Sequence, residues 1–165
     1  MYRRGFTIVE LIIVITVMGV LLVLGVVNLR GLQANARDEK RKTDIESIAL
    51  QLETYYKVGT DNTANTNSYP STVLVTNVQA TLRDADMKSF TAPGAANLAA
   101  SFIAEGGGTT TATVGPQPTT SQYGYQPLLA DGSICYLVTS VCRKFNLYYR
   151  LESDNTVYMV TSKNQ

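Results

Sequence analysis

The feature that most constrains this chain is a long apolar run near its N-terminus. Residues 6–29 contain a single charged side chain, Glu10. As an α-helix, a run of this length extends roughly 36 Å at about 1.5 Å per residue, enough to cross a hydrocarbon core of about 30 Å. The run therefore predicts one membrane-spanning helix. Arg3 and Arg4 precede it and predict a cytoplasmic N-terminus.

Glu10 is an unusual residue in such a helix. A carboxylate deep in a membrane span costs about 2.5–3.5 kcal/mol on insertion scales, so it needs a partner there. A carboxylate one turn from the end of the helix can instead extend to the lipid headgroups. The charge alone leaves both explanations open.

Composition disfavours an enzyme. The chain has 165 residues and a net charge of +1, which creates no field for recruiting nucleic acid or anionic lipid. It contains no His, the commonest general base and metal ligand. It also lacks a nucleophile elbow and a phosphate-binding glycine loop. We therefore expect no catalytic residue, no metal site and no cofactor.

The helical pattern continues past residue 29 to about residue 57. Residues 37–42 form a dense mixed-charge stretch, typical of a solvated helix face or, alternatively, of salt bridges between subunits. Apolar residues then recur with the spacing of one helix face, which predicts the face that packs against a sheet. These residues are Ile45, Ile48, Ala49, Leu52, Tyr55 and Tyr56. Gly59 lies near the expected C-cap position.

The C-terminal third of the chain predicts a β-sheet. Expected strands cover residues 123–129, 134–139, 145–151 and 156–161, with a hairpin turn at 153–155. Apolar and polar residues alternate over 145–151, as in a half-buried strand. Between helix and sheet we expect a short helix near 78–87. Residues 91–122 are low in charge and rich in Ala, Gly, Thr and Ser, which predicts a long surface loop or, alternatively, a glycosylated or partner-binding one.

The chain has two cysteines, Cys135 and Cys142. If this end of the chain lies outside the cytoplasm, a disulfide between them is expected. Closing so short a loop would stabilise the fold by roughly 2–3 kcal/mol. A pair of buried free thiols is the alternative. Two cysteines without His are too few ligands for zinc.

The N-terminal stretch RRGFTIVELI (residues 3–12) resembles the class III signal of type IV prepilins and pseudopilins. That family has a short basic leader ending in Gly, then Phe-Thr, a Glu at the fifth position of the mature chain, and a long apolar helix. Gly5 matches the last leader residue, Phe6 the new N-terminus and Glu10 the glutamate. The resemblance implies that a membrane prepilin peptidase cleaves between Gly5 and Phe6 on the cytoplasmic side and that the Phe6 amine is then methylated.

The resemblance also implies a role for Glu10 in assembly. Cleavage creates a cationic α-amino group on Phe6. In a filament of staggered subunits, Glu10 of one subunit can meet the Phe6 amine of a neighbour, and each group neutralises a charge that is costly in hydrocarbon. Many pilins also carry a helix-kinking Pro late in the apolar run, whereas this chain has Gly19 and Gly25 there and no Pro.

Together these features predict an α+β, pilin-like fold. A long N-terminal helix, half transmembrane and half amphipathic, is expected to pack on a C-terminal antiparallel β-sheet head. The expected segments are a cleaved leader (1–5), a transmembrane and filament-core helix (6–29), an amphipathic continuation (30–58) and a globular head (59–165) that contains the loop 91–122 and the sheet.

The resemblance implies a structural subunit of a type IV pilus. Such a subunit is stored in the cytoplasmic (inner) membrane, in contact with lipid. The pilus assembly machinery of that membrane then polymerises it with other pilin subunits into an extracellular filament for adhesion, motility or DNA uptake. A pseudopilin of a type II secretion system is the main alternative, but major pseudopilins typically have a calcium-binding loop and lack a disulfide. A minor pilin with a binding role is a further alternative.

Nucleic acid stays open as a partner. DNA binding calls for basic residues beside aromatic ones, and the nearest candidate is the group formed by Arg143, Lys144, Tyr148, Tyr149 and Arg150. The alternative is that these residues are solvated positions on a strand.

Overall fold

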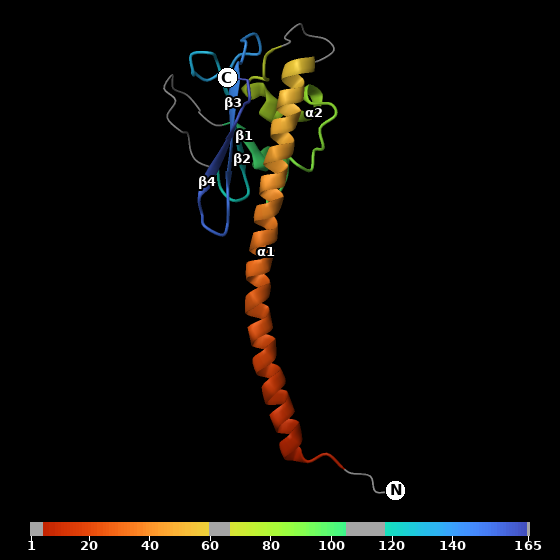
Figure 1. Ribbon diagram of the computed structural model, residues 1–165. Helices are drawn as coiled ribbons and strands as arrows, with labels where there is room; N and C mark the ends of the chain where they lie inside the picture. Colours follow the sequence, from red (N-terminus) through yellow and green to blue (C-terminus); the bar gives the residue numbers. More distant parts are fainter. Residues whose placement is uncertain (1–4, 60–66, 105–117, 165) are drawn as a thin grey trace. The chain divides into compact units, whose positions relative to one another are not determined.

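Figure 1 shows the computed structural model of the chain, which describes residues 5–59, 67–104 and 118–164. The chain divides into two compact units, Met1–Ala36 and Arg37–Gln165. One α-helix, α1 (Ile8–Val58), contributes residues to both units.

The first unit contains the apolar part of α1. Its window Ile8–Gly25 has a mean hydropathy of 2.8, and none of it is buried within the protein. By length and composition this segment is able to cross a membrane. No proline interrupts α1, and the helix ends at Gly59, whose φ of 71° is the left-handed conformation that favours glycine after a helix. The Gly59 N–H donates to the Tyr55 carbonyl at 2.7 Å.

In the second unit, the amphipathic part of α1 packs on the sheet, as its apolar stripe predicts. Ile45, Ile48 and Leu52 are fully buried. Ala49, Tyr55 and Tyr56 are partly buried against the same core. The stripe faces a core that is rich in aromatic rings, in which Tyr69 contacts Phe145 edge-on with ring centroids 4.8 Å apart. The helix is therefore fixed to the head by apolar burial along one face.

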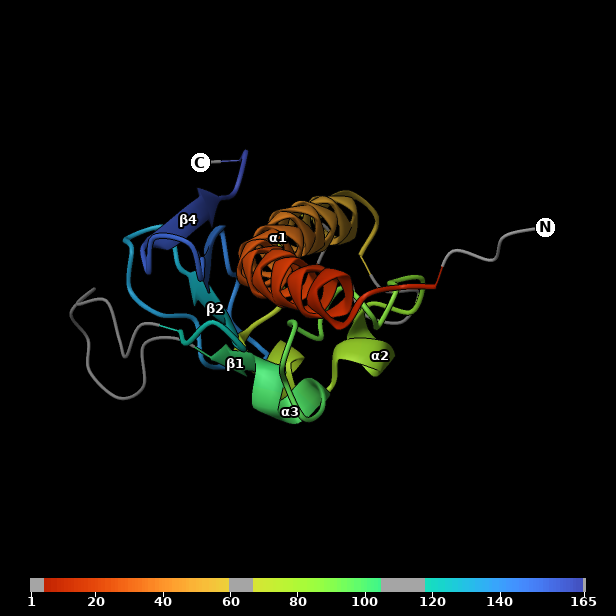
Figure 2. The same cartoon turned by 90° about the horizontal axis from the view of Figure 1, so that it is seen from below.

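The sheet has four strands in the order β1-β2-β3-β4. They are β1 (Phe102–Ala104), β2 (Tyr123–Leu128), β3 (Lys144–Arg150) and β4 (Val157–Thr161). The pairs β2–β3 and β3–β4 are antiparallel, which confirms three of the predicted strands and the α+β, pilin-like architecture. β1 joins β2 in parallel and makes the sheet mixed (Figure 2).

The predicted strand at 134–139 is wrong. Only Ile134 makes a bridge, to Leu128, and the following residues form a turn in which the Ser140 N–H donates to the Leu137 carbonyl at 3.0 Å. Leu137 and Val138 are exposed by 65% and 66%. The apolar run that suggested a strand is therefore a surface loop, because no neighbouring strand covers it.

Between helix and sheet the chain forms short elements. They are η1 (Thr72–Thr76), α2 (Val78–Thr81) and α3 (Leu98–Ser101). The helix predicted near 78–87 is thus wrong beyond Thr81, where Leu82 leaves helical geometry at φ −114° and ψ 76°. The surface loop predicted over 91–122 is wrong for α3 and β1, since Phe102 is fully buried and β1 pairs with β2 in the sheet. Residues 105–117 of that loop lie outside the described residues.

Candidate functional site

A capping box closes the N-terminal end of α1. The Thr7 hydroxyl donates to Glu10 Oε2 at 2.8 Å, the Thr7 N–H donates to the same oxygen at 2.9 Å, and the Glu10 N–H donates to Thr7 Oγ1 at 3.2 Å. Thr7 is the N-cap residue and Glu10 lies at the third helical position, which is the reciprocal pattern of a capping box. Glu10 therefore has a hydrogen-bond partner inside its own chain.

Thr7 is a residue that the sequence analysis missed. The pattern T-x-x-E before an apolar run is the signature of a capping box, so the signal was present in residues 7–10. A neutral hydroxyl and a backbone N–H, and not only an opposite charge, can therefore serve as partners of Glu10.

Gly5 and Phe6 lie just before the helix. Phe6 is 84% exposed, and a Cβ added to Gly5 would meet no heavy atom of the described residues within 4 Å. The described fold therefore does not itself require glycine at position 5. Gly5, Phe6 and Glu10 all lie in the first unit, within six consecutive residues. Cys135 and Cys142 lie in the second unit and form a disulfide with an Sγ–Sγ distance of 2.07 Å.

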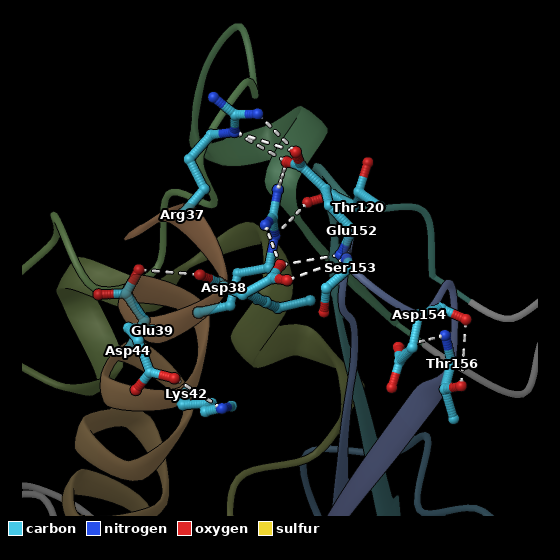
Figure 3. A network of polar contacts seen from close by, with 12 residues as sticks. Arg37, Asp38, Glu39, Lys42, Asp44, Thr120, Glu152, Ser153, Asp154 and Thr156 are labelled. Carbon is cyan, nitrogen blue, oxygen red and sulfur yellow. Dashed lines mark hydrogen bonds and ion pairs between the residues drawn. The ribbon is translucent and has the colours of Figure 1, made fainter. Parts of the chain in front are cut away.

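The second unit contains a buried ion network between α1 and the end of β3 (Figure 3). Arg41 is 1% exposed. Its guanidinium donates to Asp38 Oδ1 at 2.8 Å, to Glu152 Oε1 at 2.5 Å and to the Thr120 carbonyl at 2.6 Å. Each of the three guanidinium nitrogens thus donates a hydrogen bond. A buried charge is tolerated when it is paired and hydrogen-bonded in this way.

Asp38 binds the turn that follows β3. It accepts hydrogen bonds from the N–H groups of Glu152 and Ser153 at 2.8 and 3.0 Å. Burial raises the pKa of Asp38, but these hydrogen bonds and the charge of Arg41 outweigh it and hold the pKa below its usual value. The hydrogen bond from Arg37, at 2.6 Å, is the main cause that lowers the pKa of Glu152. The network therefore fastens the β3–β4 turn to the helix.

Both interpretations of the charged stretch 37–42 are wrong for Asp38 and Arg41, which are buried within the chain. Their partners could not be predicted from the local sequence, because Thr120 and Glu152 are distant from them in the chain. The pair Glu39–Lys42 does lie on a solvated face, with side chains 71% and 43% exposed.

The described structure does not favour the group of basic and aromatic residues considered for DNA. Tyr148 and Tyr149 are only 7% and 9% exposed, so neither ring offers a stacking surface. Tyr148 donates to Gln126 Oε1 at 2.9 Å, and Tyr149 stacks on Tyr158. Arg150 donates to the Pro118 carbonyl at 2.9 Å. Among the described residues, no group of three or more His, Cys, Asp or Glu could hold a metal ion.

The apolar helix near the N-terminus fits a membrane-anchored precursor. Residues 1–26 match the family model of the prokaryotic N-terminal methylation motif. This motif is the class III signal of type IV pilins and pseudopilins, so the resemblance found in the sequence is confirmed. No curated protein and no solved structure matches the chain. The motif supports a structural protein of the type IV pilin or pseudopilin family, processed by prepilin peptidase and assembled with other pilins.

Proposed function

We propose that this chain is a structural subunit of a type IV pilus. Prepilin peptidase cleaves between Gly5 and Phe6, the Phe6 amine is methylated, and the mature chain polymerises into an extracellular filament. The observation that carries the proposal is the methylation motif over residues 1–26, followed by an apolar helix with none of the window Ile8–Gly25 buried. A side chain at position 5 would meet no heavy atom of the described fold. We therefore propose that the peptidase, and not the fold, requires glycine at this position.

The proposal divides the chain into four parts. Residues 1–5 are the leader, residues 6–29 form the membrane and filament-core helix, residues 30–58 continue the helix, and residues 59–165 form the head. Before assembly the helix 6–29 lies in the cytoplasmic membrane. In the filament it packs against the same segment of neighbouring subunits, and extraction from lipid requires the assembly machinery of that membrane.

Glu10 has two tasks in this mechanism. In the single chain, its Oε2 accepts from the Thr7 hydroxyl and N–H and closes the first helical turn. Both hydrogen bonds from Thr7 go to Oε2. We assign Oε1 to the methylated Phe6 amine of a neighbouring subunit. The cap holds the carboxylate at the helix start, so the contact forms in one register of staggered subunits and is lost in others.

A minor pilin with a binding role is the second candidate. The loop closed by Cys135 and Cys142 exposes four apolar side chains, which a solvated head would not need. They are Tyr136, Leu137, Val138 and Val141. A type II secretion pseudopilin is less favoured, because the disulfide is unusual for major pseudopilins. Whether the filament serves adhesion, motility or DNA uptake would depend on what the head binds.

The test compares two substitutions of Glu10. We expect Glu10→Ala to leave the chain cleaved and inserted in the membrane but to abolish filaments in sheared cell-surface material. Glu10→Gln keeps a capping-box side chain but removes the charge. The charge-pairing mechanism predicts that Gln fails as Ala does. Filaments at the wild-type level in the Gln variant would show that the cap, and not the charge, is needed; filaments in both would overturn the assembly role of Glu10.

A further inference from the structure

The outer edge of β4 carries backbone groups that point away from the sheet. β4 stands at the end of the strand order and pairs only with β3 among the described strands. The Leu151 N–H donates to the Thr156 carbonyl at 3.1 Å, and the Ser162 N–H donates to the Phe145 carbonyl at 3.0 Å. In an antiparallel pair, alternate residues face the partner strand. Tyr158 and Val160 therefore bond to β3, as Thr156 and Ser162 do. The N–H and C=O groups of three residues face outward: Val157, Met159 and Thr161.

This edge lacks the usual protection against pairing. The sequence of β4, VYMVT, has no charge and no proline, and its register with β3 continues without a bulge. Tyr158 is 39% and Met159 53% exposed. The opposite edge strand, β1, has only three residues. β4 is thus the edge that offers the longer and more apolar template for another strand.

We propose that β4 pairs with β4 of a second copy of this chain, antiparallel and two-fold about Met159. In this register Met159 faces Met159 of the second copy, and Val157 faces Thr161. The outward backbone groups of the two copies then oppose one another and form about six hydrogen bonds. The contact is isologous, so each copy contributes the same surface.

Charge complementarity favours a second copy as the occupant. The exposed Lys163 follows the end of β4, and the exposed Asp154 lies in the turn before its start. Antiparallel pairing about Met159 places the end of one strand beside the turn of the other, so opposite charges meet at both ends of the contact. A parallel arrangement would set like charges beside each other. The contact uses residues of the second unit only, and it does not depend on the proposed filament.

Cysteine cross-linking of the full-length chain in detergent tests this register. Both native cysteines are bonded to each other, so the wild type supplies no free thiol. Directly opposed residues in a hydrogen-bonded pair have Cα atoms about 5.5 Å apart, within the range of a disulfide. The Met159→Cys substitution should therefore form dimers under mild oxidation. In the proposed register the two copies of residue 157 lie roughly 14 Å apart, so Val157→Cys alone should not.

Two controls make the experiment specific. Leu137→Cys, at a position exposed by 65%, measures chance collisions. A mixture of Val157→Cys and Thr161→Cys chains should give the mixed dimer. We expect Met159→Cys to form dimers at least about tenfold faster than Leu137→Cys and than Val157→Cys alone. Equal rates for Met159→Cys and Leu137→Cys would overturn the contact, and equal rates for Met159→Cys and Val157→Cys would overturn its antiparallel register.

A second pair of variants tests the backbone contact without new thiols. Met159→Pro removes an N–H that faces outward and leaves the β3–β4 hydrogen bonds in place. Met159→Ala shortens the side chain and keeps that N–H. Sedimentation in detergent should show that the Ala variant retains the dimer and that the Pro variant loses it. Equal dimer fractions in the two variants would contradict pairing through the edge.

Discussion

At the scale of single residues, Arg41 is the most buried charged side chain among the described residues, at 1% exposure. Removing its side chain would leave Asp38 and Glu152 without their shared cation in a buried site. We expect Arg41→Ala to lower the free energy of unfolding by about 3–5 kcal/mol. Chemical unfolding of the full-length chain in detergent, followed by near-UV circular dichroism of the tyrosines, measures this loss.

Arg37→Ala is the matched control for Arg41. Arg37 also pairs with Glu152, but its side chain is 42% exposed, so its removal should cost much less stability than the removal of Arg41. If the two substitutions lowered the free energy of unfolding equally, burial would not explain the contribution of Arg41 to stability.

The same network predicts how stability depends on pH. The pKa values of Asp38 and Glu152 are lowered in the folded chain from ordinary values of 3.8 and 4.5. A carboxyl group with a lower pKa in the folded state contributes stability that is complete above its unfolded pKa and is lost as pH falls through the folded pKa. We therefore expect the Tm of the head to fall as the pH drops below 4.5.

The pH effect is checked by thermal unfolding from neutral pH to about pH 3. Glu152→Gln removes one of the two titrating groups, so its Tm should fall less steeply in the acid range. Parallel curves for the variant and the wild type would show that Glu152 does not contribute to the acid dependence.

At the scale of elements, the apolar face of α1 determines how the helix holds the sheet. Ile48 is fully buried against the sheet, whereas Leu50, two residues further, is 64% exposed. We expect Ile48→Ala to destabilise the head by about 2–5 kcal/mol and Leu50→Ala by no more than about 0.5 kcal/mol. Urea unfolding of both variants measures the difference; comparable losses would mean that the opposite face of α1 also packs within the single chain.

The elements that could be predicted from sequence are those with a clear period. The stripe from Ile45 to Tyr56 has the helical period, and residues 145–151 alternate as a half-buried strand does. β1 could not be predicted in this way. It has three residues, Phe102–Ala104, with no alternation, and its parallel partner β2 comes from elsewhere in the chain. The run 134–139 shows the opposite case, since its composition suits a strand but the fold supplies no neighbour for it.

The residues of the candidate site differ in the same way, because some have a local sequence signal and others have partners distant in the chain. Gly5, Phe6 and Glu10 can be proposed from sequence because their signal is local, and the Thr7–Glu10 capping box could have been predicted for the same reason. The Asp38–Arg41–Glu152 network could not, because local sequence shows charges on a helix but not the distant turn that covers them.

At the scale of the whole molecule, the proposed function joins an anchor segment to a self-contained head. The described head buries the Asp38–Arg41 ion pair and a core of aromatic rings, while the apolar window Ile8–Gly25 is unburied in the single chain. A segment of this kind is covered either by lipid or by copies of itself. The methylation motif supports both states, first the membrane precursor and then the assembly with other pilins.

Mass spectrometry of material sheared from the cell surface tests the central claim most directly. The account predicts a mature chain that begins at methylated Phe6 and lacks two hydrogens because of the Cys135–Cys142 bond. A processed chain found only in membranes would contradict the pilus and favour a pseudopilin or minor subunit. An intact chain that begins at Met1 in every fraction would contradict the cleavage itself.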